Sequence, residues 1–246
     1  MIFKERGYEN FLKENNVNLE GIIKCENEPC FHTKIFVADR KDTITFVQMR
    51  HLQFGEPNET HYRLIDQAEI LYFAINDLKF NLKCLNYASN KRKTIIHNLS
   101  SEIIFDTDYL PYAMENSDIQ ILNEAEYKNL CNLQRGDIND ILERYSRLQH
   151  LIVTKGKLGS SLFSKEGKDI KKTDVDSVFV ERGGVPVGLG DAYSAGVVYG
   201  ISIGWDLQRA IKFGSYLGAV SFQSEYSFIE RKILEECREK FDKEFK

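Results

Sequence analysis

The sequence predicts an α/β fold in which helices cover a mostly parallel β-sheet. Short apolar runs recur along the middle of the chain, and segments with helical periodicity separate them. Apolar runs of three to five residues are typical of parallel strands buried on both faces, and strands that alternate with helices indicate an α/β architecture. The runs expected to form strands are residues 70–74, 94–96, 103–105, 119–122 and 151–153, and the clearest helical segments are 124–133 and 138–148.

The first 50 residues have a different pattern. Residues 3–16 have the spacing of a helix that ends at an Asn-Asn pair, and residues 21–24 have the composition of a short strand. Two alternating stretches, 31–38 and 43–48, are joined by the polar sequence DRKD. This arrangement predicts a β-hairpin.

The last third of the chain is expected to contain a second hairpin, a glycine-rich loop and three helices. The hairpin is predicted to run through segments 159–163, 167–169 and 178–180. The loop and helices are expected at residues 183–190, 191–202, 207–222 and from 229 onward. The last of these has apolar residues on one side and Glu–Lys pairs on the other, which is typical of an amphipathic surface helix.

Composition excludes several functional classes. The chain has 246 residues and a net charge of −4, so it lacks the basic surface that nucleic acids or anionic lipids require. Its five cysteines are scattered without a C-x-x-C pair, which argues against a disulfide framework and favours the cytoplasm. The polar start does not resemble a signal peptide, and no apolar run approaches the ~20 residues that span a bilayer.

The segment with the strongest chemical signal is GLGDAYSAG at residues 188–196. Glycines just before a helix allow backbone N–H groups to converge, and the partial positive charge of the helix N-terminus makes that point an anion site. Beside a bound phosphoryl group, the carboxylate of Asp191 could accept a proton from an attacking hydroxyl. The third glycine of a dinucleotide fingerprint is missing, and no P-loop sequence occurs. A purely structural turn with an aspartate cap remains the alternative.

The helix that follows this segment carries small residues on one side. Ala192, Ala195, Gly196 and Gly200 recur at helical spacing. We expect this side to approach the sheet closely.

Several motifs, taken in order, resemble the ribokinase/PfkB carbohydrate-kinase family. Residues 188–196 are similar to its C-terminal G-A-G-D signature, and residues 199–206 are similar to its bacterial adenosine-kinase-like branch. Residues 153–159 (VTKGKLG) resemble its nucleotide-binding strand and turn, and residues 123–126 (NEAE) match its N-x-x-E motif. The hairpin at 25–50 lies where the family has a substrate-covering lid. The resemblance implies a single ribokinase-like domain over residues 1–246.

The resemblance also implies catalytic roles. Asp191 would deprotonate the substrate hydroxyl. The amides of Gly188, Leu189 and Gly190 would stabilise charge on the transferred phosphoryl group, the largest contribution in such catalysis. Gly188 and Gly190 would thereby also belong to the ATP-binding set.

The remaining implied roles concern ATP and Mg²⁺. Thr154, Gly156 and Gly159 would line the nucleotide site. Glu126 with Asn123 would orient hydrated Mg²⁺, a hard ion suited to carboxylate, water and phosphate oxygens, and Asn123 would also belong to the cofactor site. The structural alternative for Asn123 and Glu126 is a helix N-cap and a first-turn acid, and both roles can hold together.

The sequence departs from the family pattern at several places. The first strand and the Gly-Gly-x-x-x-Asn substrate motif have no counterpart, so we expect the N-terminal strands of the fold to be absent. Val185-Pro186-Val187 stands where the family has D-T-T or D-P-T, and Thr107-Asp108-Tyr109 replaces P-G-Q after Asp106. Residues 224–227 replace the sequence G-G-Q-N.

These observations predict an ATP-dependent kinase that phosphorylates a hydroxymethyl group of a nucleoside, adenosine being the first candidate, or of a sugar. The alternative is a catalytically weakened or inactive kinase-like protein that binds nucleotides or a partner. Apolar residues along the 31–48 hairpin also suggest a homodimer formed through the lid.

Overall fold

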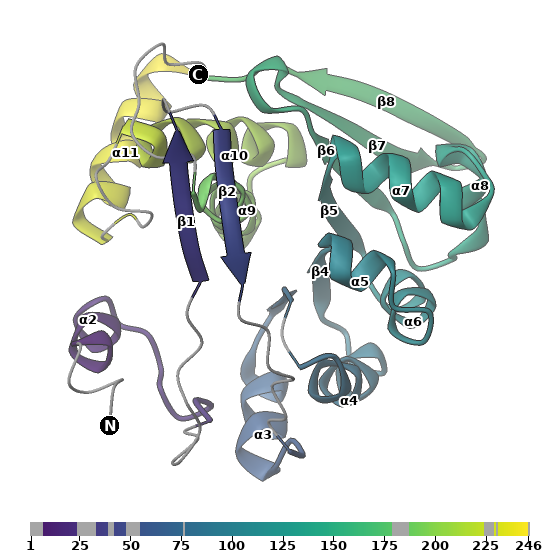
Figure 1. Ribbon diagram of the computed structural model, residues 1–246, viewed down its shortest axis with the longest axis horizontal. Coiled ribbons are helices and arrows are strands. Elements are labelled where there is room, and N and C mark those ends of the chain that lie inside the picture. Colours follow the sequence, from purple (N-terminus) through teal and green to yellow (C-terminus); the bar gives the residue numbers. More distant parts are fainter. Residues whose placement is uncertain are drawn as a thin grey trace.

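A six-stranded sheet forms the centre of the computed structural model (Figure 1). The structure describes residues 7–23, 33–38, 42–47, 55–75, 77–178, 187–223, 229 and 231–245, with segments 33–38 and 42–47 described by their backbone. The strand order is β3-β4-β5-β6-β7-β8. The strands are β3 (Ile70–Phe73), β4 (Thr94–Asn98), β5 (Ile119–Asn123), β6 (His150–Thr154), β7 (Ser160–Glu166) and β8 (Asp169–Val175).

The first four strands are parallel, and the last two form an antiparallel hairpin beside β6. The register aligns Asn123 with Thr154, Thr154 with Ser160, and Ser160 with Val175. One row across the sheet therefore joins the carboxyl ends of β5 and β6 to the β7–β8 hairpin. The predicted mostly parallel α/β sheet is confirmed.

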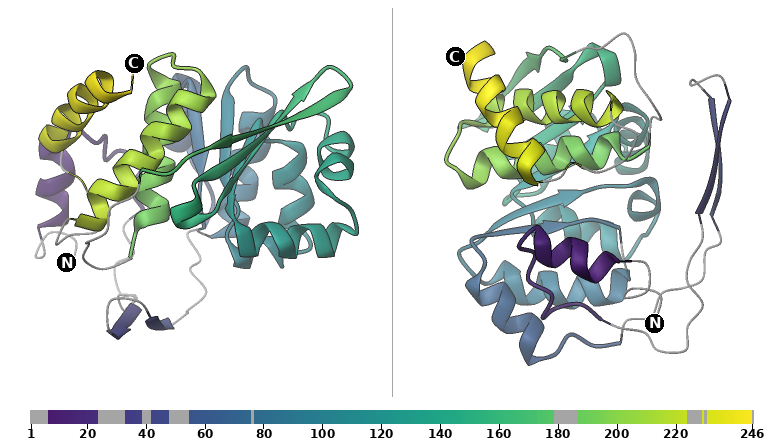
Figure 2. Two further views of the ribbon diagram at one scale, coloured as in Figure 1. Left: turned by 90° about the horizontal axis from the view of Figure 1, so that it is seen from above. Right: turned by 90° about the vertical axis from the view of Figure 1, so that its left-hand side faces the viewer.

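Helices cover both faces of this sheet (Figure 2). Adjacent residues of β4 point to opposite faces, so Ile95 joins the core on one side and Ile96 the core on the other. The first face is covered by α3 (Glu59–Gln67), α4 (Leu78–Ser89), α5 (Ser101–Ile104), α6 (Tyr109–Glu115), α7 (Glu124–Gln134) and α8 (Ile138–Arg144). The second is covered by α9 (Leu189–Ser202) and α10 (Leu207–Gln223), with α11 (Arg231–Glu244) packed behind α10.

The N-terminal elements are α2 (Tyr8–Glu14) and a separate two-stranded sheet of β1 (Thr33–Ala38) and β2 (Asp42–Val47). The predicted hairpin is confirmed in this antiparallel pair. The apolar lid surface proposed for a homodimer depends on side chains that lie outside the described part of the chain. None of the described helices is long and apolar enough to cross a membrane.

Three expected elements differ in the structure. Residues 103–105 were expected to form a strand, but Ile103 and Ile104 belong to the single-turn helix α5. Because β4 pairs directly with β5, the sheet offers no place for another strand between them. Residues 21–23 form no strand, and a Cβ added at Gly21 would stand 2.9 Å from Leu64 Cδ1 of α3.

The second hairpin returns earlier than expected. Its outer strand is the polar segment β8, and Val178 lies beyond the end of that strand. This is an edge strand whose residues are mostly exposed, so it lacks the apolar pattern that marks a buried strand. The helix expected from Asp191 begins two residues earlier, at Leu189.

Gly196 and Gly200 of α9 contact α10 and not the sheet, and Ala195 is exposed, which corrects the expectation above. A Cβ at Gly196 would stand 2.7 Å from Gly214 Cα, and a Cβ at Gly200 would stand 2.7 Å from Ala210 Cβ. Tyr193 and Val197, each three residues before one of these glycines, lie on the adjoining part of the same face and pack in the core against the sheet. The glycines therefore allow close packing with α10, while their larger neighbours fill the space above the strands.

Candidate active site

A tight turn follows β6 at the carboxyl edge of the sheet. The amide of Lys155 donates to the carbonyl oxygen of Gly159 at 2.8 Å, and the amide of Gly159 donates to Gly156 at 3.0 Å, around a 3₁₀ turn at Gly156–Leu158. Gly156 and Gly159 both have positive φ, at 56° and 86°, which favours glycine. The chain thus leaves β6 and enters β7 without a long loop.

The N-terminus of α9 faces the same region. Gly188 is its N-cap in a left-handed conformation, with φ 76°. The first-turn amides of Leu189, Gly190 and Asp191 have no intrahelical acceptor, so they concentrate partial positive charge at this end. These amides belong to the segment in which the sequence predicts an anion site.

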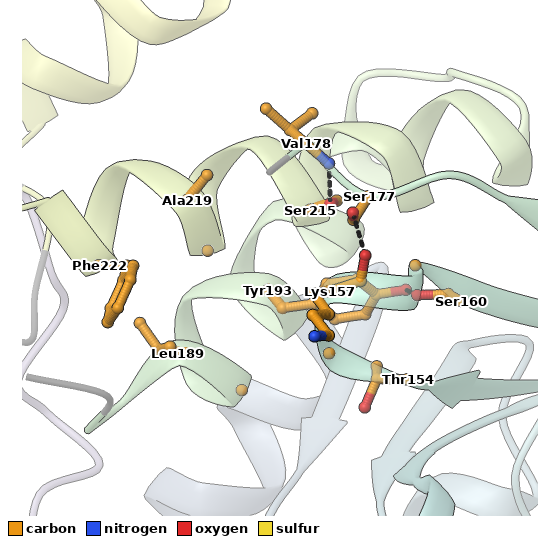
Figure 3. A pocket seen from close by; sticks show the side chains of 14 residues that line it. Thr154, Lys157, Ser160, Ser177, Val178, Leu189, Tyr193, Ser215, Ala219 and Phe222 are labelled. Atoms are coloured by element: carbon orange, nitrogen blue, oxygen red, sulfur yellow. Dashed lines mark hydrogen bonds between the residues drawn. The ribbon is translucent and has the colours of Figure 1, made fainter. Parts of the chain in front are cut away.

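A cavity of about 270 Å³ lies between this turn and the helices α9 and α10 (Figure 3). Its volume is close to the lower end of the range for small-molecule sites, ~300–1,000 Å³. Most of its lining is apolar or hydroxylic. The lining residues are Thr154, Gly156, Lys157, Gly159, Ser160, Ser177, Val178, Leu189, Gly190, Tyr193, Ser215, Gly218, Ala219 and Phe222.

Three hydrogen bonds connect the walls of this cavity (Figure 3). The Ser177 hydroxyl donates to the carbonyl oxygen of Lys157 at 2.7 Å. The amide of Val178 donates to Ser215 Oγ of α10 at 2.8 Å. Tyr193 of α9 donates its hydroxyl proton to Ser160 of β7, also at 2.8 Å. Each serine bond therefore joins two segments that are distant in the sequence.

The sequence did not predict that residues of α10 form one wall of the cavity, here called the α10 wall. Ser215, Gly218, Ala219 and Phe222 follow the i, i+3, i+4, i+7 spacing of one helix face. This pattern was available in the sequence, but it is the same pattern that marks any buried helix face. Only the packing of α10 behind α9 shows that this part of the face borders a cavity.

The structure brings most of the predicted site residues together. Thr154, Gly156, Gly159, Leu189 and Gly190 all line the cavity. They come from the end of β6, the following turn and the first turn of α9. The expected nucleotide-binding residues and the expected anion site therefore share one cavity.

Asp191 and Gly188 lie beside this cavity and not in its lining. Gly188 immediately precedes the lining residues Leu189 and Gly190, and Asp191 immediately follows them. The side chain of Asp191 is exposed. A carboxylate at this position faces solvent, where a second molecule can approach.

Asn123 and Glu126 form a capping box at the start of α7. The Glu126 amide donates to Asn123 Oδ1 at 2.9 Å, and the Asn123 amide donates to Glu126 Oε2 at 2.8 Å. The structural role considered for this pair is therefore confirmed. Burial raises the pKa of Glu126, and the nearby Glu102 carboxylate raises it further, while the Asn123 amide opposes both. Asn123 pairs with Thr154 on the neighbouring strand, so it lies beside a residue of the cavity lining.

Among the departures from the family pattern, Val185, Pro186 and residues 224–227 lie outside the described part of the chain. Asp106 accepts hydrogen bonds from the amides of Asp108 and Tyr109, which starts α6. Within the described residues, no group of three or more His, Cys, Asp or Glu side chains is arranged to hold a metal ion.

Comparison with known proteins gives concordant results. The chain is 28% identical over 217 residues to a nucleoside kinase of Methanocaldococcus jannaschii, which covers 87% of this chain and 67% of that protein. It is 26% identical to a 5-dehydro-2-deoxygluconokinase of Geobacillus thermodenitrificans over 197 residues, 69% of this chain and 54% of that protein. The chain thus spans about half to two thirds of the length of these relatives.

Structural similarity agrees at the level of the fold. A nucleoside kinase of Burkholderia thailandensis, solved in complex with inosine, superposes with a TM-score of 0.79. The match covers 97% of this chain and 76% of that one, at 20% identity. The sequence model of the "pfkB family carbohydrate kinase" matches residues 3–229. The chain therefore has a ribokinase-like fold and belongs to the PfkB family of carbohydrate kinases.

Proposed function

We propose that this protein transfers the γ-phosphoryl group of ATP to a hydroxymethyl group of a nucleoside. The observation that carries the proposal is the position of the cavity relative to α9. Leu189 and Gly190 line the cavity, and Asp191 follows them in the same helical turn. A nucleotide in the cavity would direct its phosphates toward the N-terminal amides, which favour negative charge.

In this proposal each residue has a defined task. Val178, Ala219 and Phe222 provide apolar contacts for a base. The amides of Leu189 and Gly190 stabilise the charge on the transferred phosphoryl oxygens. Asp191 accepts the proton of the acceptor hydroxyl as that oxygen bonds to the γ-phosphorus. The bond from the γ-phosphorus to the bridging oxygen breaks, and its electron pair leaves with ADP.

Mg²⁺ would neutralise charge on the ATP phosphates, and Asn123 with Glu126 are the residues proposed to orient it. Mg²⁺ usually keeps several waters and takes one or two carboxylates, so a single glutamate fits its needs. The capping box uses Glu126 Oε2, and the backbone of Ser101 also hydrogen-bonds to this carboxylate. Burial raises the pKa of Glu126 and repulsion from Glu102 raises it further, and a divalent cation would favour the charged form.

We favour a nucleoside over a sugar as the acceptor because the archaeal nucleoside kinase is similar to this chain in sequence, at 28% identity over 87% of the chain, and in structure, with a TM-score of 0.79. The extent of the sequence match alone does not separate the two classes, since a 5-dehydro-2-deoxygluconokinase of Photobacterium profundum is 27% identical over 88% of this chain. The neighbour solved with inosine superposes over 97% of the chain. We propose adenosine as the first acceptor to test and inosine as the second.

The test combines binding with turnover. Thermal unfolding of the purified chain with and without Mg·ATP measures binding, because a ligand specific for the native state raises Tm. ADP release with adenosine, inosine, fructose and 5-dehydro-2-deoxygluconate then identifies the acceptor. We expect Asp191→Asn to keep the Mg·ATP shift and to lower turnover at least a hundredfold, since a general base contributes ~10²–10⁴-fold.

The matched control is Asp169→Asn, which removes another exposed carboxylate, at the start of β8 and outside the cavity lining. It should retain full turnover. A Tm that does not respond to any nucleotide would refute the kinase proposal for this chain. Binding without turnover in the wild type would support the alternative, a nucleotide-binding member of the family with little or no catalysis.

A further inference from the structure

The hydrogen bond between Tyr193 and Ser160 joins the two halves of the candidate active site. Tyr193 lies two residues after Asp191 on α9, and Ser160 immediately follows the turn that contains Gly159. The Tyr193 hydroxyl lies 2.8 Å from Ser160 Oγ. The two residues are only 7% and 3% exposed. The bond links helix α9 directly to strand β7, and both residues line the cavity.

Both ends of this bond are held by close backbone packing. At the Ser160 end, a Cβ added to the preceding Gly159 would stand 2.2 Å from the carbonyl oxygen of Val175. At the Tyr193 end, a Cβ added to Gly214 of α10 would stand 2.6 Å from the Tyr193 carbonyl oxygen and 3.4 Å from its ring. Neither end can shift without moving a neighbouring strand or helix.

We infer that Tyr193 and Ser160 are positioning residues for the transfer reaction, setting the distance between the α9 amides and the nucleotide-binding turn. The inference rests on the proposed function. Neither hydroxyl needs to contact the transferred group. Their bond fixes the first turn of α9, which carries Asp191, relative to Gly156 and Gly159. A misplacement of about 1 Å between reacting groups can lower the rate ~100-fold, so a bond that fixes their distance affects the rate of the reaction.

A purely structural role makes a different prediction. If the bond only satisfies two buried polar groups, removing both hydroxyls together should cost little, because no unpaired group remains. If the bond positions α9, removing both hydroxyls should restore stability and leave turnover impaired. The single and double variants therefore separate the two roles.

The test uses Tyr193→Phe, Ser160→Ala and the double variant of the full chain. We expect each single variant to lower kcat about tenfold and to leave the KM for Mg·ATP within about twofold, because the cavity lining is otherwise kept. Tm should fall in the single variants and recover in the double variant, whose kcat stays low.

Tyr109→Phe is the matched control. Tyr109 is 2% exposed, and its hydroxyl lies 2.8 Å from His97 Nε2, at a place outside the cavity lining. This variant removes the same atom at similar burial. It should lower Tm without changing kcat.

Two results would overturn the inference: a double variant that recovers kcat together with Tm, or a Tyr109→Phe variant that loses as much kcat as Tyr193→Phe. A wild-type chain that neither binds Mg·ATP nor transfers phosphate would refute the proposed function instead. In that case amide hydrogen exchange decides on the bond. Tyr193→Phe should then speed exchange in residues 156–160 and 189–192 together, and unchanged exchange in either segment would refute the positioning role.

Discussion

Gly159 and Val175 approach so closely that a Cβ atom on Gly159 would lie 2.2 Å from the Val175 carbonyl oxygen. Gly159 also has a φ of 86°, which side chains rarely adopt. The turn at residues 155–159 is therefore held against the end of β8 by backbone contact. This contact makes glycine a steric requirement at position 159, independently of any ligand.

Gly159→Ala should consequently destabilise the protein by at least ~2 kcal/mol, combining left-handed backbone strain with a backbone clash. Gly156→Ala is the control, because its φ is also positive but a Cβ there would meet nothing within 4 Å. It should cost about 1 kcal/mol. Urea unfolding measures both values, and equal losses would show that the clash is relieved by movement of β8.

Two glycines of α10, four residues apart, should respond in opposite ways. A Cβ at Gly214 would stand 2.6 Å from the Tyr193 carbonyl oxygen, whereas a Cβ at Gly218 would meet only Leu189 O at 3.7 Å. Gly214→Ala should push α9 and α10 apart and lower stability by ~1–3 kcal/mol. Gly218→Ala should be neutral or stabilising by up to ~1 kcal/mol, since alanine favours helices.

The Gly218→Ala variant also tests whether the nucleotide binds in the cavity. Gly218 lines the cavity, so the added methyl group should weaken Mg·ATP binding although the fold is intact. Titration of Mg·ATP against the Gly218→Ala variant measures this effect. An unchanged affinity would place the nucleotide away from the α10 wall.

The free energy of unfolding should decrease as the pH is lowered, because of a buried histidine. His97 has no exposed surface, its Nε2 lies 2.8 Å from the Tyr109 hydroxyl, and burial lowers its pKa to about 4. In the unfolded chain its pKa is about 6.5. The unfolded state therefore binds a proton that the native state does not, and the stability present above pH 6.5 is lost progressively as pH falls toward 4.

This single group should cost about 2 kcal/mol between pH 7 and pH 5. Urea unfolding of the wild type and of His97→Gln at both pH values isolates its contribution, and the variant should show the smaller pH dependence. His150 also has a lowered pKa through burial and remains in both proteins. An equal pH dependence in the two proteins would assign the effect to other groups.

Arg147 holds together the amino ends of three strands. Its guanidinium donates to Asp118 through Nε at 3.1 Å and Nη2 at 3.0 Å, and it donates to the carbonyl oxygens of Ser89 and Lys93 at 2.9 Å each. Lysine cannot reproduce this planar set of donors. Arg147→Lys should lower stability by ~1–3 kcal/mol and leave turnover unchanged. Arg92→Lys, at an exposed position nearby, should change neither quantity.

Some of the secondary structure could be read from the chain and some could not. The runs at β4, β5 and β6 were recognisable because strands buried on both faces need apolar residues at nearly every position. The run at Ile103 and Ile104 has the same composition but forms a helical turn, since burial alone does not distinguish a strand from a helix. The edge strand β8 was not predicted because its mostly exposed, polar residues lack the apolar run that marks a buried strand.

The candidate site divides in a similar way. Leu189, Gly190 and Asp191 were predictable because glycines and an acid at a helix start leave local traces in the sequence, whereas Gly156 and Gly159 were predicted from the resemblance to the family. Asn123 and Glu126 were likewise recognisable from their capping-box spacing. Their proposed role toward Mg²⁺ adds to this local structure and is a separate question for experiment.

The sequence by itself determined the α/β class, the family and the local turns that present backbone amides, because each depends on residues close together in the chain. Only the tertiary structure decided which surfaces meet. Ser160 and Tyr193 are 33 positions apart, and Val178 and Ser215 are 37 apart. Their contacts arise from the packing of α9 and α10 on the sheet, which glycines at Gly196 and Gly214 permit. Such long-range packing leaves no local pattern, so the shape of the cavity had to come from the fold.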